Sequence, residues 1–176
     1  NTYAAIVRHY IQNFQDDARR ELQFFAIQRD IDKVLEYAAY AKLPSGKRHP
    51  HQYRLKRSAL RKVHHRLRSC GVEHCESFDE LFETVRDAIA DIDGIGELMV
   101  YDTAHRIGAF LGLEPQRVYL HAGTRVGAQA LGCDADSDAC EAGDLPKAFQ
   151  QLTPAAVEDC LCIYKRDIRR IRGVTR

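Results

Sequence analysis

Three side chains of this sequence have the chemical types needed for acid–base chemistry. His121 is a histidine, the residue type that can act as a general acid or a general base near neutral pH. Asp102 can serve as a base or orient a histidine, and Tyr119 lies two residues before His121. Each also has an ordinary role open to it, as a helix cap, a core hydrogen-bonding group or a surface group. We therefore treat His121, Asp102 and Tyr119 as candidate catalytic residues and keep these structural roles as alternatives.

A second group of residues has the composition of a phosphate-binding turn. The stretch Ile92–Gly96 lies between two segments whose apolar residues recur every three or four positions, which predicts two helices joined by a turn. Gly94 can end the first helix in the left-handed conformation, and Ile95 would be buried between the helices. Gly96 lets a phosphate approach the start of the second helix, where N–H groups and the helix dipole favour an anion. The alternative is a plain helical hairpin.

The sequence also concentrates positive charge in one segment. Between Tyr37 and Val72 there is no Asp or Glu, and this span holds ten Lys or Arg and four His, although the whole chain has a net charge of only +1. This polarity predicts a basic surface patch for an anionic partner, with a solvated connector as the alternative. The candidate DNA-binding residues from the turn and this segment are Gly94, Ile95, Gly96, Lys47, Arg48, Arg54, Lys56, Arg57 and Arg61.

The candidate residues are expected to lie on helices or on the loops between them. Ser77 with Glu80 three residues later predicts a capping box at the start of the hairpin, and Asp30 is a candidate cap of an earlier helix. Segment 118–132 is rich in small residues and predicts either a closely packed helix or a short strand followed by a helix. We expect an all-α fold, a single compact helical domain over 1–176 with about seven helices. Within it, the hairpin occupies about 78–111 and the basic loop and helix about 42–70.

The hairpin, the short turn after it and the Val118–His121 segment together resemble the helix-hairpin-helix superfamily of base-excision DNA glycosylases. The resemblance covers roughly residues 78–132, under a third of the chain. It implies a DNA-binding fold and adds Leu98 and Arg125 to the candidate DNA-binding residues. Two positions depart from the family: Tyr119 stands where its catalytic aspartate would be, and Leu98 where bifunctional members carry a nucleophilic lysine.

These departures argue against ordinary glycosylase chemistry. The leading hypothesis is therefore a DNA-binding protein that grips the phosphate backbone of double-stranded or distorted DNA with low sequence specificity. One alternative is an enzyme related to these glycosylases that acts on a DNA base in repair, base modification or defence, with a flipped base between the hairpin and segment 119–125. Another is a protein-interaction module whose basic face meets an acidic protein. The sequence leaves the oligomeric state open.

The six cysteines are expected to be free thiols, because the sequence shows no signal peptide. Cys133 and Cys140 have the first spacing of the iron–sulfur loop in some of these glycosylases, but the two close-spaced cysteines that follow there are absent. Cys70, His74 and Cys75 form only a partial zinc set, so we expect no metal and no cofactor. No apolar run is long enough to span a bilayer, which predicts a cytoplasmic protein without a membrane partner.

Overall fold

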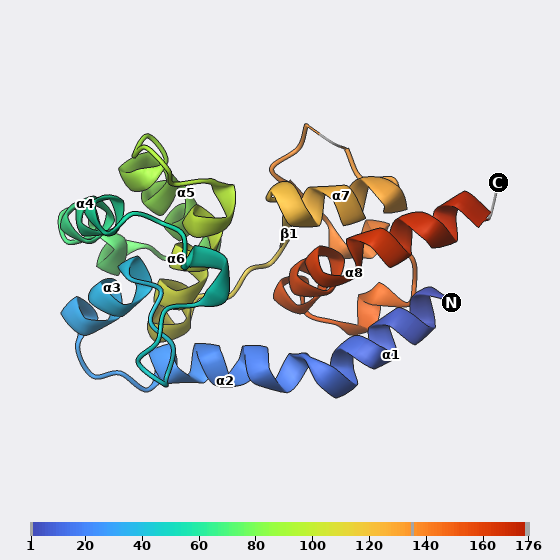
Figure 1. The fold of residues 1–176 in the computed structure, drawn as a ribbon, viewed down its shortest axis with the longest axis horizontal. Helices are drawn as coiled ribbons and strands as arrows, with labels where there is room; N and C mark the ends of the chain where they lie inside the picture. Colours follow the sequence, from blue (N-terminus) through green and yellow to red (C-terminus); the bar gives the residue numbers. More distant parts are fainter. Residues whose placement is uncertain (1, 135, 175–176) are drawn as a thin grey trace. The chain divides into compact units, whose positions relative to one another are not determined.

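The computed structural model describes residues 2–134 and 136–174, and this part of the chain is mostly helical, with eight α-helices and one two-stranded sheet (Figure 1). The mostly helical fold that the sequence predicts is confirmed. The chain divides into two compact units. We call Arg19–Glu114 the central unit, and the residues up to Ala18 together with those from Pro115 onward the terminal unit. That the whole chain is a single domain stays a prediction, since two compact units can fold together or separately.

The central unit holds the hairpin and the basic segment around one core. It contains most of α2 (Gln15–Ala26), then α3 (Ile31–Ala39), α4 (Arg57–Leu67), α5 (Phe78–Ile89) and α6 (Glu97–Leu111), with 3₁₀ turns at Pro50–Gln52 and Val72–His74. Helix α6 packs against α5 and α3, and α4 packs against α3 and α5. Leu60, Leu81 and Ile107, from α4, α5 and α6, are completely buried. The apolar residues of the basic helix α4 and of the α5–α6 hairpin therefore share one hydrophobic core.

Two helix starts form where the sequence predicts them. At the start of α5, the Ser77 hydroxyl oxygen accepts a hydrogen bond from the backbone N–H of Glu80 at 3.2 Å. In a capping box the Glu80 carboxylate would accept a hydrogen bond from the backbone N–H of Ser77. Here it accepts from the N–H of the residue before, Glu76, at 2.9 Å. Asp30 caps α3 by accepting from the N–H of Asp32 at 2.9 Å. These bonds satisfy N–H groups that the first helical turn leaves without a partner.

The terminal unit combines helices with a minimal sheet. It contains α1 (Tyr3–Asn13), the start of α2, β1 (Val118–Tyr119), α7 (Ala122–Leu131), β2 (Ala139–Cys140) and α8 (Pro154–Val174), with 3₁₀ turns at Ala142–Asp144 and Phe149–Gln151. Strands β1 and β2 pair antiparallel, so the alternative of a strand followed by a helix is confirmed for segment 118–132. Helix α7 packs against α8, and a Cβ on Gly127 would lie 2.6 Å from the Leu161 carbonyl oxygen. The small residues of α7 thus permit close helix packing, as predicted.

Candidate functional site

The predicted turn between α5 and α6 contains two glycines, Gly94 and Gly96, that have different backbone conformations. Gly94 has a φ of +87°, the left-handed conformation that its residue type predicts. The Ile95 side chain is buried, and its N–H donates to the Ile92 carbonyl at 2.9 Å. Gly96 is the N-cap of α6, with an extended backbone (φ −106°, ψ 175°). The turn therefore presents two exposed glycines on either side of a buried isoleucine.

The start of α6 has the geometry of an anion-binding helix end. The Gly96 carbonyl accepts hydrogen bonds from the N–H groups of Met99 and Val100 at 3.0 and 3.2 Å, so the helix begins directly after the turn. A Cβ on Gly96 would meet no heavy atom within 4 Å, so packing does not require glycine there. Leu98 is half-buried in the first helical turn. The positive end of the helix dipole lies at this exposed end of α6 and favours an anion.

Carboxylates beside the turn oppose an approaching anion. Asp93 is exposed, and Glu97 occupies the first turn of α6. An anionic partner would therefore need positive charge from elsewhere in the central unit, and α4 is attached close by. The Arg66 guanidinium at the end of α4 donates to the Ala88 carbonyl at 3.0 Å and pairs with the Asp91 carboxylate. This contact joins the end of the basic helix to the end of α5, shortly before the turn.

The basic segment presents most of its charge to solvent. Six of its Lys and Arg side chains are exposed and form no ion pair within the part of the chain that the structure describes. They are Lys47, Arg54, Lys56, Arg57, Arg61 and Lys62. Arg57 and Arg61 lie four residues apart on α4 and so share one face of the helix. These six side chains therefore have no counter-ion among the described residues.

Two other cations of the segment are bound within the central unit. The Arg48 guanidinium donates to the carbonyls of Tyr53 and Leu55 at 3.3 and 3.0 Å. Lys42 pairs with the Glu36 carboxylate at 2.8 Å, and this lysine together with a second one lowers the pKa of Glu36. Arg48, a candidate DNA-binding residue, therefore shapes the loop that carries the exposed cations.

A partly buried ionic network connects the basic loop to α6. Arg106, whose side chain is 4% exposed, donates to the Glu21 carboxylate through Nε and Nη2 at 3.1 and 3.0 Å. Its Nη2 lies 3.7 Å from the Asp102 carboxylate. The buried Gln52 side chain donates to the same Asp102, and His49 Nε2 lies 3.5 Å from Glu21. The candidate catalytic residue Asp102, whose side chain is half-buried, thus links α6 to the loop in the central unit.

His121 belongs to a buried cluster in the terminal unit. Its Nε2 contacts the Glu158 carboxylate and lies 2.8 Å from the Thr124 hydroxyl oxygen. The Thr124 hydroxyl is also within 2.8 Å of the same Glu158 oxygen. All three side chains are buried, and they connect the start of α7 to α8. The cluster is therefore largely shielded from bulk solvent.

The other two candidates of the terminal unit are also integrated into its packing. Tyr119 is buried in β1. The Arg125 guanidinium donates to the carbonyls of Ser137 and Leu120 at 2.6 and 2.8 Å. The candidate catalytic residues are thereby divided between the units, with Asp102 alone in the central one.

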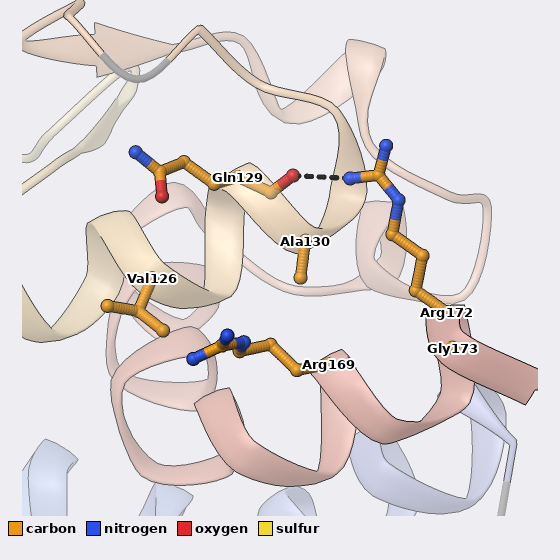
Figure 2. Close-up of a pocket in the computed structure, with 6 residues that line it drawn as sticks. All are labelled: Val126, Gln129, Ala130, Arg169, Arg172 and Gly173. Carbon is orange, nitrogen blue, oxygen red and sulfur yellow. Dashed lines mark hydrogen bonds between the residues drawn. The ribbon is translucent and has the colours of Figure 1, made fainter.

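The terminal unit also contains a pocket that the sequence does not predict. It lies between α7 and α8 and has a volume of about 410 Å³ (Figure 2). Its lining residues are Val126, Gln129, Ala130, Arg169, Arg172 and Gly173. Arg172 donates to the Gln129 carbonyl at 2.5 Å, while Arg169 extends towards Val126 (Figure 2). The basic end of α8 is visible in the sequence, but only helix packing shows which of its arginines line a hollow.

Comparison with known proteins identifies no relative. No protein-family model, no curated protein and no solved structure matches the chain. Residues 2–134 and 136–174 contain no cluster of three or more His, Cys, Asp or Glu arranged to hold a metal ion. None of the helices described is both long enough and apolar enough to cross a membrane.

Proposed function

We propose that the protein binds the phosphate backbone of DNA through its central unit. In this proposal the hairpin of α5 and α6 is a helix-hairpin-helix motif, and the cations of segment 47–62 supply most of the affinity. The observation that carries the proposal is the group of six exposed cations that have no ion-pair partner among the described residues. These cations belong to the same compact unit as the hairpin. Clustered charge that a protein leaves unneutralised suits a polyanionic partner.

The two parts of the proposed interface contribute in different ways. Lys and Arg side chains that neutralise phosphates release counter-ions from DNA, which provides affinity without sequence specificity. The start of α6 would position one phosphate, because Gly96 has no side chain and the helix dipole favours an anion there. The carboxylates of Asp93 and Glu97 reduce the attraction of the turn for a phosphate. In the proposal the turn therefore positions the DNA backbone, and α4 supplies most of the positive charge. Double-stranded or distorted DNA is the proposed partner.

The geometry favours binding over catalysis. His121 is buried against Glu158, and Asp102 is held by Gln52 beside Arg106. His121 is 2% exposed and the Asp102 side chain 19%, and the positions that carry catalytic groups in the glycosylases hold Tyr119 and Leu98 here. We therefore propose a binding protein rather than an enzyme acting on DNA bases.

The test is the salt dependence of DNA binding, measured by fluorescence anisotropy with a labelled duplex. The double variant Arg57→Gln/Arg61→Gln removes two neighbouring cations of α4. It should weaken binding and lower the slope of log affinity against log salt by about one unit for each lost phosphate contact. The control Arg29→Gln/Lys33→Gln removes the same charge from the central unit outside the acid-free segment. It should change the slope little.

The outcomes separate the alternatives. Equal losses in the two double variants would show that net charge matters and that the α4 face does not. Failure of the wild-type protein to bind DNA even at low salt would remove the proposal. Binding to an acidic protein in that case would favour the interaction module.

A further inference from the structure

Tyr53 is the most exposed large hydrophobic side chain in the described part of the chain, with an exposed fraction of 74%. It lies between the 3₁₀ turn Pro50–Gln52 and the start of α4, within the basic segment. Single exposed apolar residues are common on protein surfaces, so exposure alone has little meaning. Two further features distinguish Tyr53. Hydrogen bonds hold the backbone of its loop in place, and exposed cations follow it closely in the sequence.

The backbone that carries Tyr53 is held in place by side chains on both sides. The Arg48 guanidinium donates to the carbonyl of Tyr53 itself and to that of Leu55. The preceding residue, Gln52, is buried and donates to the Asp102 carboxylate of α6. The ring therefore projects from a supported backbone. A ligand that stacks on it would not have to order the loop first, which reduces the entropic cost of binding.

Positive charge follows Tyr53 closely in the sequence. Arg54, Lys56 and Arg57 lie one, three and four positions after it, all exposed and without an ion pair among the residues described. Segment 37–72 contains no carboxylate side chain that could compete for them. An exposed aromatic ring with flanking cations matches the needs of an unpaired nucleotide, whose base stacks on the ring while phosphates contact the cations. A continuous duplex offers no such base, because its base faces are already stacked.

We propose that Tyr53 stacks on an unpaired base and that the preferred ligand of the central unit is DNA containing an unpaired nucleotide. This inference rests on the proposed function, because it names the substrate class of the same basic surface. The cations around Tyr53 would bind any DNA backbone. Tyr53 would add affinity only where a base is free to leave the stack.

The experiment compares two labelled DNAs by fluorescence anisotropy. One is a matched duplex, and the other is the same duplex with an unpaired fluorescent aminopurine base. The wild-type protein should bind the second about ten-fold more tightly and quench the aminopurine, since base–aromatic stacking typically contributes an effect of this size. Tyr53→Ala should abolish the preference and the quenching, with affinity for the matched duplex unchanged. Tyr53→Phe should retain both effects.

Ile27→Ala is the matched control, because Ile27 is 63% exposed in the same unit but is not aromatic. It should retain the preference and the quenching. If Tyr53→Ala still prefers and quenches the unpaired base, the stacking role is overturned. If the wild-type protein binds both DNAs equally and remains salt-sensitive, this inference fails while backbone binding stands. If neither DNA binds, the proposed function itself fails.

Discussion

His105 shows how packing changes the chemistry of a side chain that the sequence presents as titratable. It lies on α6 beside the rings of Phe78 and Tyr101, with ring centroids 6.1 and 5.4 Å away. Burial lowers the pKa of His105 to about 4, with Asp102 opposing the shift and Arg106 adding to it. His105 is therefore neutral at physiological pH and serves as packing in the central unit.

We expect the free energy of unfolding to fall as the pH is lowered from 6.5 towards about 4. In this range the unfolded chain binds a proton at His105 that the folded chain does not, so the stability is present above this window and lost below it. Burial also lowers the pKa of His49 and of His64, which adds to the trend. The contribution of His105 is at most about 3 kcal/mol. Urea unfolding near neutral and mildly acidic pH measures it.

The matched variants for this prediction are His105→Phe and His65→Gln. His105→Phe should reduce the dependence of stability on pH, because it removes the group that the unfolded chain protonates. His65 is exposed on α4, so His65→Gln should leave the dependence unchanged. An unaltered pH dependence in His105→Phe would contradict the assignment.

Cys133 and Cys140 are a second case in which the fold determines side-chain chemistry. Their Sγ atoms are 3.1 Å apart. Burial, together with the neighbouring Cys133, raises the pKa of the Cys140 thiol. The pair is therefore placed for an internal disulfide, although Cys140 is a poor nucleophile at neutral pH because little of it is thiolate.

We expect oxidised glutathione to convert this pair into a disulfide. The two protein thiols lose two protons and two electrons, and the oxidant is reduced to two molecules of glutathione. The reaction should accelerate above neutral pH as the thiolate fraction rises. Mass spectrometry after alkylation should show Cys133 and Cys140 cross-linked in the wild type, whereas in Cys140→Ser Cys133 should appear only as the alkylated thiol or as a mixed disulfide with glutathione. Persistent alkylation of both thiols in oxidised wild-type protein would contradict this.

At the scale of elements, the two glycines of the hairpin have different roles: Gly94 is required by its backbone conformation, whereas Gly96 is proposed to contact a phosphate. Gly94 has a φ of +87°, where other residues are strained, while Gly96 has an extended backbone with free space around it. We expect Gly94→Ala to lower the free energy of unfolding by about 1–2 kcal/mol. Gly96→Ala should leave stability nearly unchanged and weaken DNA binding, because the added methyl group would keep a phosphate away. Urea unfolding and anisotropy measure the two effects. Wild-type affinity in Gly96→Ala would place the phosphate elsewhere.

At the scale of the whole molecule, a net charge of +1 conceals an uneven distribution. The terminal unit has its own basic helix end, but Arg170 pairs there with Asp167 at 3.6 Å and Arg172 binds the Gln129 carbonyl. The acid-free segment of the central unit has more exposed charge without such partners among the described residues. On the proposed function, the location of charge, rather than its total, would determine where DNA binds.

This inference predicts unequal effects of charge removal in the two units. Arg166→Gln/Arg169→Gln removes two exposed cations of α8, and Arg57→Gln/Arg61→Gln removes two of α4. Both variants have the same net charge, so the long-range attraction for DNA is matched. We expect the α4 variant to lose clearly more affinity in anisotropy titrations at low salt. A greater loss in the α8 variant would move the interface to the terminal unit.

The sequence by itself determined the helical character of the chain, the caps at Ser77 and Asp30, the conformation of Gly94 and the location of the basic segment. These features depend on neighbours a few positions away, so apolar spacing and residue type are sufficient to predict them. For segment 118–132 the sequence allowed two alternatives, a helix or a strand followed by a helix. The pairing of β1 with β2 shows that the second is correct.

Only the tertiary structure decided which polar side chains have partners. Arg106 meets Glu21 from 85 positions away, and His121 meets Glu158 from 37 positions away. Arg48 binds backbone carbonyls while Arg57 faces solvent, although both are arginines of the same acid-free segment. Local sequence does not distinguish these cases, because burial and hydrogen bonding depend on elements brought together by the packing of the core.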